Sequence, residues 1–218
     1  MKGLGRNIRF MMGRFHESLI LTGVIFLFTF IVLNIGNEDV VARMKEAGPL
    51  YYLLLTVILI LCTIGFGESY LPTIVSVGAS RKPTATGMLL SQHIFMLEQL
   101  AFLFVVAVLL ESSKSMQAVR ICPLGTVALL VLILGIGNLF NAIDINGHKL
   151  FGVIAGFVLG TSAIVFVLVI AIKCDFNINV EVFRTYNSWW LLLLGLVVDL
   201  VGAYFYYKAV TKVDLKLA

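Results

Sequence analysis

Six long apolar runs constrain this chain more than any other feature of its sequence. Each run is bounded by charged residues, glycine, proline or asparagine, and each approaches the roughly 20 residues that a helix needs to cross a bilayer core. Backbone groups in lipid must be hydrogen-bonded within the protein, and the runs lack the alternation of a β-barrel strand, so we expect helices. The runs are Ser18–Ile35, Leu50–Phe66, Met88–Leu110, Leu124–Phe140, Phe151–Ile172 and Trp189–Tyr207.

The composition excludes several classes of protein. The chain has 218 residues, of which 60% are hydrophobic and only 13% are charged, about half the charged fraction of a soluble domain. A soluble globule of this size has too little interior to bury so much apolar surface. The net charge of +4 comes from residues that flank apolar runs, where basic residues set membrane topology. A cytosolic enzyme, a disordered protein and a nucleic-acid-binding protein are therefore excluded.

Lysine and arginine predict the orientation of the chain. With the N-terminus inside the cell, ten of these residues would lie in cytoplasmic segments and six in outer loops. Because cytoplasmic segments carry the excess of positive charge, both termini are predicted to be cytoplasmic. The predicted fold is an all-α integral membrane protein of the cell membrane (the plasma membrane), with six transmembrane helices within residues 17–218.

The leader at residues 1–16 has an amphipathic pattern. Its basic residues fall opposite an apolar face at helical spacing, which consists of Leu4, Ile8, Met11 and Phe15. A basic amphipathic helix of this kind lies in the membrane interface, in contact with lipid. We therefore predict an interfacial (elbow) helix. It either sets the topology alone or also touches a cytoplasmic partner.

The segment Leu71–Pro83 lies between the second and third runs, on the predicted cytoplasmic side. Its body is apolar, yet it is too short to span a membrane. Pro72 lies near a predicted helix start, and the segment closes with Gly78, a cationic Ser-Arg-Lys turn and Pro83, which is expected to stop a helix. Something apolar must cover this segment, either the protein's own helix bundle or another protein.

These residues carry a resemblance to a known family. The sequence Gly78-Ala79-Ser80-Arg81-Lys82 follows an apolar helix between the second and third of six membrane helices. In this it resembles the permease subunits of bacterial type-2 ABC exporters. The amphipathic leader and the six helices with both ends inside also fit that family. The small size is similar to that of compact permeases of peptide exporters, such as the phenol-soluble modulin exporter.

The resemblance implies a function and its partners. Two such permease chains, forming a homodimer or a heterodimer, would carry an amphipathic or hydrophobic peptide across the membrane. Cytosolic ABC ATPase subunits would bind ATP and Mg, because this chain has no Walker-type loop, no catalytic motif and no cofactor site. They would dock on the coupling segment 71–83, the leader and the turn at 141–149, and the coupling residues would be Ile74, Val75, Val77, Gly78, Arg81 and Lys82.

Ionisable residues within or beside the apolar runs are further candidates, because charge is costly in a bilayer and must face the bundle interior, water or a partner. His93 and Glu98 are five residues apart, about 140° around a helix, so they should not share a face. An alternative function, a proton-coupled secondary transporter or an intramembrane enzyme, would use Glu68, His93 and Glu98. Glu98 and Asp199 are candidate pathway or interhelix polar residues, and for Asp199 both roles stay open.

A polar cluster follows the fourth run. It contains Asn138, Asn141 and Asp144 and continues through Asn146-Gly147-His148. We expect a tight cytoplasmic turn, because Asn-Gly and Asp side chains favour turn conformations. The spacing and the terminal Glu of a calcium loop are absent, so no metal site is predicted.

Overall fold

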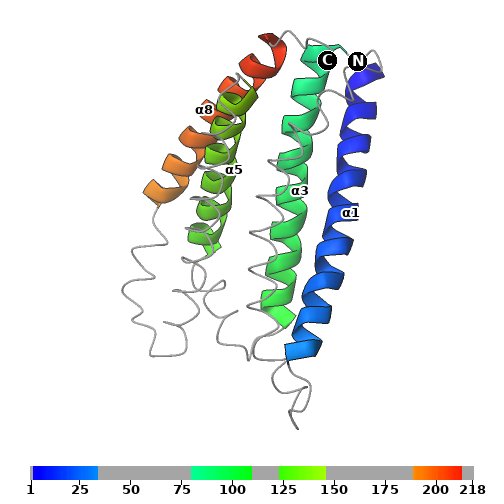
Figure 1. Cartoon of the computed structure of the whole chain (residues 1–218). Coiled ribbons are helices and arrows are strands. Elements are labelled where there is room, and N and C mark those ends of the chain that lie inside the picture. Colours follow the sequence, from blue (N-terminus) through cyan, green and yellow to red (C-terminus); the bar gives the residue numbers. More distant parts are fainter. Residues whose placement is uncertain (1, 34–79, 110–122, 146–188, 213–218) are drawn as a thin grey trace.

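The structure is a computed structural model that describes residues 2–33, 80–109, 123–145 and 189–212. These residues form four helices, α1 (Lys2–Leu33), α3 (Arg81–Leu109), α5 (Pro123–Ile145) and α8 (Trp189–Lys212) (Figure 1). Three of them, α3, α5 and α8, are long and apolar enough to cross a membrane. The chain is therefore a helical membrane protein. The predicted runs Leu50–Phe66 and Phe151–Ile172 lie outside the described residues.

The helices α1 and α3 form one pair (Figure 1). Asn7 donates a hydrogen bond from Nδ2 to Oγ1 of Thr84 over 3.3 Å near the start of both helices. Further along, the rings of Phe15 and Phe95 lie 5.3 Å apart. Because both sequence numbers increase together along the contact, α1 and α3 are parallel.

The helices α5 and α8 form the second and closer pair. A Cβ atom on Gly195 would lie 3.0 Å from the carbonyl oxygen of Ala128, and one on Gly202 would collide with the backbone of Gly135. The register shows that α5 and α8 are also parallel. Small residues at a helix contact let two backbones approach closely, which is how helices commonly pack within membranes.

Side chains of α3 and α8 link the two pairs in antiparallel order. His93 bonds to Asp199, and Met88, which lies earlier in α3, bonds to Tyr206, which lies later in α8. The starts of α1 and α3 and the ends of α5 and α8 therefore share one end of the bundle. We call it the basic end, because the half of the bundle nearer to it holds every lysine and arginine of the described residues: Lys2, Arg6, Arg9, Arg14, Arg81, Lys82, Lys208 and Lys212.

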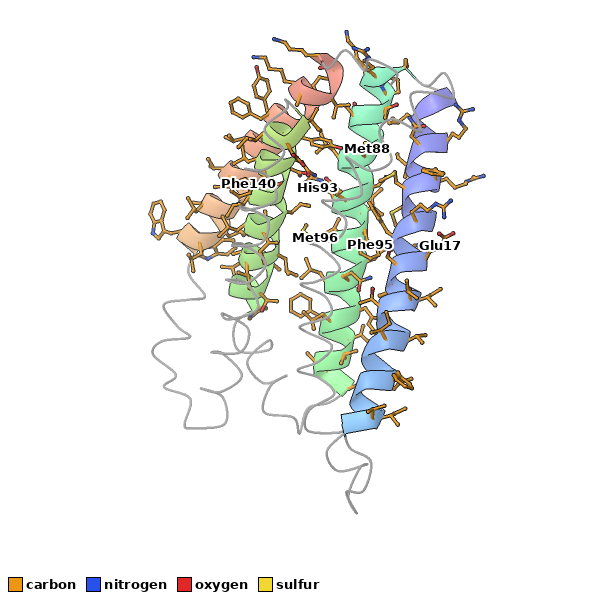
Figure 2. All side chains as sticks on the ribbon, viewed as in Figure 1. Glu17, Met88, His93, Phe95, Met96 and Phe140 are labelled. Carbon is orange, nitrogen blue, oxygen red and sulfur yellow. The ribbon has the colours of Figure 1, made fainter. Side chains whose placement is uncertain are left out.

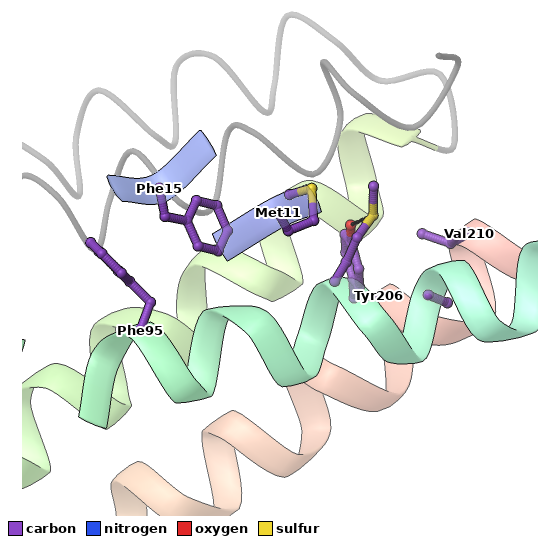
Figure 3. Close-up of a cluster of buried hydrophobic side chains, with 7 residues drawn as sticks. Met11, Phe15, Phe95, Tyr206 and Val210 are labelled. Carbon is purple, nitrogen blue, oxygen red and sulfur yellow. Dashed lines mark hydrogen bonds between the residues drawn. The ribbon is translucent and has the colours of Figure 1, made fainter. Parts of the chain in front are cut away.

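Buried apolar side chains hold the helices together in two clusters. The cluster toward the basic end joins α1, α3 and α8 through Met11, Phe15, Ala85, Met88, Phe95, Tyr206 and Val210 (Figure 3). The other joins α3 to α5 through Met96, Leu100, Leu130, Val131, Ile133 and Leu134. On the outer surface many large apolar side chains are exposed, for example Ile20 at 67% and Leu200 at 70%, as expected of helices that face lipid.

The leader and the first apolar run form one continuous helix, where we expected an interfacial helix ending near residue 16. Met11 and Phe15 are fully buried in the cluster shared with α3 and α8, while Leu4 and Ile8 are half-buried and Arg6 is exposed. The apolar face of the leader is thus covered by other helices of the bundle. Its position at a membrane surface stays a prediction.

Two predicted turns are helical in the structure. Arg81 and Lys82 form the first turn of α3, and Pro83 lies in that turn instead of stopping a helix. Proline is tolerated there because the first N–H groups of a helix have no intrahelical acceptor. Asn138, Asn141 and Asp144 belong to α5, which ends at Ile145. The rest of that predicted turn, Asn146, Gly147 and His148, lies outside the described residues.

The α5–α8 contact gives a first prediction. A methyl group at Gly135 would lie 2.5 Å from the backbone N and Cα of Asp199, so Gly135→Ala must push the helices apart. We expect a loss of about 1–3 kcal/mol in the free energy of unfolding, measured by denaturant titration in bicelles. Gly13→Ala is the matched control, since a Cβ there meets nothing within 4 Å and alanine favours a helix. Equal stability of the two variants would contradict this contact.

Candidate functional site

Asp199 is the centre of a polar junction between three helices. Its backbone lies against Gly135 of α5, and its side chain reaches α3, where Oδ2 lies 2.8 Å from Nε2 of His93. Figure 2 shows that His93 points from α3 toward α5 and α8, whereas Phe95 points toward α1. The contact with Gly135 fixes the position of the Asp199 backbone. The hydrogen bond to His93 fixes the position of its carboxylate oxygen Oδ2.

The carboxylate of this pair is more deeply buried than the imidazole. Only 10% of the Asp199 side chain is exposed, against 32% of the His93 side chain. Nδ1 of His93 lies 2.7 Å from the carbonyl oxygen of Leu89. A carbonyl oxygen can only accept a hydrogen bond, so the network assigns a proton to Nδ1.

Further polar atoms are buried in the same bundle. Asp199 Oδ1 is buried and accepts no hydrogen bond within the described helices, and neither amide atom of Asn138 has a partner there. Asn138 is fully buried on α5, three residues after Gly135. Buried polar atoms without a hydrogen bond lower the stability of a fold, so they are expected at functional sites.

A second histidine–carboxylate pair lies on the other side of α3. Nε2 of His16 on α1 is 3.0 Å from Oε2 of Glu98, and both side chains are nearly half exposed. Beside it, Arg14 Nη1 donates to Oε2 of Glu17 over 2.6 Å at the exposed surface. Because α3 contributes a residue to both histidine–carboxylate pairs, it connects α1 with α8.

The structure places the candidate residues as follows. His93 and Glu98 are not paired with each other, and each bonds to a different helix. Asp199 makes an interhelical hydrogen bond, which is one of the two roles considered for it. Of the coupling residues, Arg81 and Lys82 begin α3 at the basic end. The other candidates on that side, Ile74, Val75, Val77, Gly78 and Glu68, lie outside the described residues.

Three residues of the helix contacts and the second histidine pair were missed in the sequence. Gly135 and Gly202 occur inside apolar runs, where a glycine signals close approach of another backbone, but the partner helix is not evident from one run. His16 follows the amphipathic leader and lacks any local signal, because its partner Glu98 is 82 residues away.

No protein family, characterised protein or solved structure matches this chain. Among the residues of the four helices, no three His, Cys, Asp or Glu side chains are grouped so as to hold a metal ion. The chemistry that the junction offers is the binding and release of a proton, since an imidazole and a carboxylate share one short hydrogen bond.

The two histidine pairs should differ in their contribution to stability. Removal of His93 leaves the Asp199 carboxylate buried without its partner, which costs about 3–5 kcal/mol when a buried pair is broken. Removal of His16 breaks an exposed pair, which is worth about 1 kcal/mol or less. We therefore expect His93→Ala to lower the free energy of unfolding in bicelles far more than His16→Ala. A comparable loss in both variants would show that Asp199 is not buried as the structure has it.

Proposed function

We propose that this chain is the membrane-domain subunit of an ATP-driven ABC exporter. It has six transmembrane helices, its basic end and both termini face the cytoplasm of the cell, and it docks a separate ATPase. The single observation that carries the proposal is that the described parts of the candidate docking segments, residues 2–16, 80–83 and 141–145, lie toward the basic end of the bundle.

Contacts at the basic end support this arrangement. The leader packs on the start of α3, where a Cβ atom on Gly87 would lie 3.0 Å from that of Asn7. The end of the coupling segment is the first turn of α3, and Ile145 at the end of α5 packs on the same apolar cluster as the leader. One cytosolic partner could therefore contact the leader, the start of α3 and the end of α5 together.

The directions of the helices support six crossings. Parallel neighbours in a membrane require the chain between them to return across the bilayer. The interval between α1 and α3 contains the predicted span Leu50–Phe66, and the interval between α5 and α8 contains Phe151–Ile172. The helices α3 and α5 are antiparallel, and the interval between them contains no apolar run.

The helix α3 would transmit movement from the ATPase. It is continuous over 29 residues, or about 43 Å at 1.5 Å per residue. It is bonded to α1 through Thr84 and to α8 through Met88 and His93. A displacement of its first turn would tilt α3 against both neighbours, in the manner of rigid helices that shift at interfaces.

The cargo would be an amphipathic or hydrophobic peptide, and a second permease chain would complete the pathway. The described helices offer few charges beyond the basic end, which suits an apolar cargo better than a highly charged one. ATP and Mg would bind the partner ATPase. This chain would form the pathway of the cargo through the membrane and would transmit the movement of the ATPase to that pathway.

The orientation is tested by cysteine labelling on a background in which Cys62, Cys122 and Cys174 are replaced. Trp190→Cys lies at the start of α8, where the side chain is 79% exposed, and Lys212→Cys lies at its basic end. A membrane-impermeant maleimide should label Trp190→Cys in intact cells and Lys212→Cys only after permeabilisation. The opposite pattern would contradict the proposed topology.

The docking site is tested by Lys82→Glu. Lys82 is exposed in the first turn of α3, and a basic residue at the rim of an interface orients a partner more than it tightens binding. We expect binding of the ATPase that co-purifies with the tagged wild-type chain to weaken by about 1 kcal/mol, or roughly fivefold, and cargo-stimulated ATP hydrolysis to fall.

The matched control is Lys212→Glu, which makes the same charge change at the basic end but on α8, outside the coupling segment. It should retain both ATPase binding and stimulated hydrolysis. Equal losses in the two variants would indicate a general effect of charge. Absence of any ATPase from wild-type preparations made in the native host would overturn the proposed function.

A further inference from the structure

We propose that His93 and Asp199 form a proton-binding site, and that the bound proton holds α3 against α8. The inference rests on the hydrogen-bond geometry of the junction and does not depend on an ATPase partner. Its ligand is a proton, which the two side chains share.

The geometry fixes the number of protons on the pair. Nδ1 of His93 carries a hydrogen, because its partner is the carbonyl oxygen of Leu89. A second hydrogen must lie between Nε2 and Asp199 Oδ2, since these atoms are 2.8 Å apart and two lone pairs would repel at that distance. The pair thus holds one proton more than a neutral imidazole and a carboxylate.

Sharing of this proton makes the pair neutral overall. It is either an imidazolium beside a carboxylate or a neutral imidazole beside a carboxylic acid, and both forms belong to one coupled titration. The second oxygen, Asp199 Oδ1, is buried without a hydrogen bond in the described helices. An ionised carboxylate in this position is costly, so the shared proton stabilises the junction as it stands.

Loss of the proton cannot leave the junction unchanged. With Nδ1 still bound to Leu89, a lone pair on Nε2 would face a carboxylate oxygen, and the junction would hold a net negative charge. With the proton on Nε2 instead, the lone pair of Nδ1 would face the Leu89 carbonyl, 2.7 Å away. Either form requires His93 to move relative to Asp199 or to its own helix.

Other charged groups near the junction are engaged elsewhere or lie at a distance. On the α1 side of α3, Glu98 is bonded to His16, and Arg14 to Glu17. On α5, Asp144 is nine residues beyond Gly135, and on α8, Lys208 is nine residues beyond Asp199, about 14 Å along each helix. Loss of the proton that His93 and Asp199 share is therefore the change expected to act on this contact.

The contact between α3 and α8 combines an apolar cluster, which includes Met88, Tyr206 and Val210, with polar links between the two helices. One of these links joins His93 to Asp199, and another runs from the Tyr206 hydroxyl to Met88 Sδ over 3.1 Å, where sulfur is a weak acceptor. The helix α8 is held firmly to α5 by the glycine contacts. Release of the proton should therefore shift α3 relative to the α5–α8 pair, with α8 staying on α5.

The experiment measures the distance between α3 and α8 as a function of pH. Spin labels are attached to Leu97→Cys and Leu200→Cys of the full chain in lipid nanodiscs, with the three native cysteines replaced. Both side chains are exposed, at 60% and 70%, so the labels leave the core intact. Between about pH 5 and pH 9, the range over which imidazoles titrate, pulsed electron resonance should show a narrow short distance that lengthens and broadens as the pH rises.

Asp199→Asn in the same labelled chain removes the carboxylate charge but keeps a hydrogen bond to His93 in both of its protonation states. When His93 is protonated, the amide oxygen accepts from Nε2. An asparagine amide can donate to Nε2 of a neutral His93 that still donates from Nδ1 to Leu89, so the short distance should persist at every pH. The control is His16→Gln, which alters only the exposed pair and should retain the wild-type pH response.

A second measurement needs no variant at the junction. The chain has three histidines, so histidine-selective ¹⁵N labelling gives few signals, and His16→Gln and His148→Gln assign His93 by elimination. The ¹⁵N signals of His93 should shift over the same pH interval in which the label distance changes. A wild-type distance that does not respond to pH would overturn the proposal, as would an Asp199→Asn variant with the wild-type response.

Discussion

The contact between the backbones of α5 and α8 at Gly135 determines the position of everything else in the bundle. Because no side chain separates the helices there, the Cα of Asp199 is held at a fixed place against α5. From that position its carboxylate reaches α3 and bonds to His93. The helix α3 in turn carries α1 on its opposite face through Phe95 and Glu98. The backbone contact at Gly135 thus sets the geometry of the His93–Asp199 pair.

Polar residues occur in two different settings in the bundle, exposed at its basic end and buried between the helices. At the basic end, exposed lysines and arginines offer a surface to a cytosolic partner, as the proposed function requires. Deeper in the bundle, the Asp199 carboxylate is largely buried beside an imidazole, and burial makes the loss of a partner costly. The continuous helix α3 runs through both levels. It can therefore carry an effect from the surface to the interior or in the reverse direction.

Sequence reasoning succeeded where the physical constraint is local. The runs that became α3, α5 and α8 were predicted because the bilayer dictates the length and composition of a crossing helix. The ends of these helices were not predicted. Helix α5 continues past its apolar region, because polar residues such as Asn138 and Asn141 are buried within the bundle. The pairing of His93 with Asp199 depends on helix register across 106 residues. The angle between His93 and Glu98 on one helix excluded their pairing but did not identify either partner.

The separation in sequence between Gly135 and its partner residues has a consequence for biosynthesis. The helices α1, α3 and α5 leave the ribosome before α8, so for a time His93 has no carboxylate and the glycine face of α5 has no partner. During that interval, buried groups such as Asn138 are open to lipid or to the insertion machinery. The arrival of α8 completes the polar junction in one step, and a chain that lacks this helix would present unsatisfied polar groups that membrane quality control can recognise.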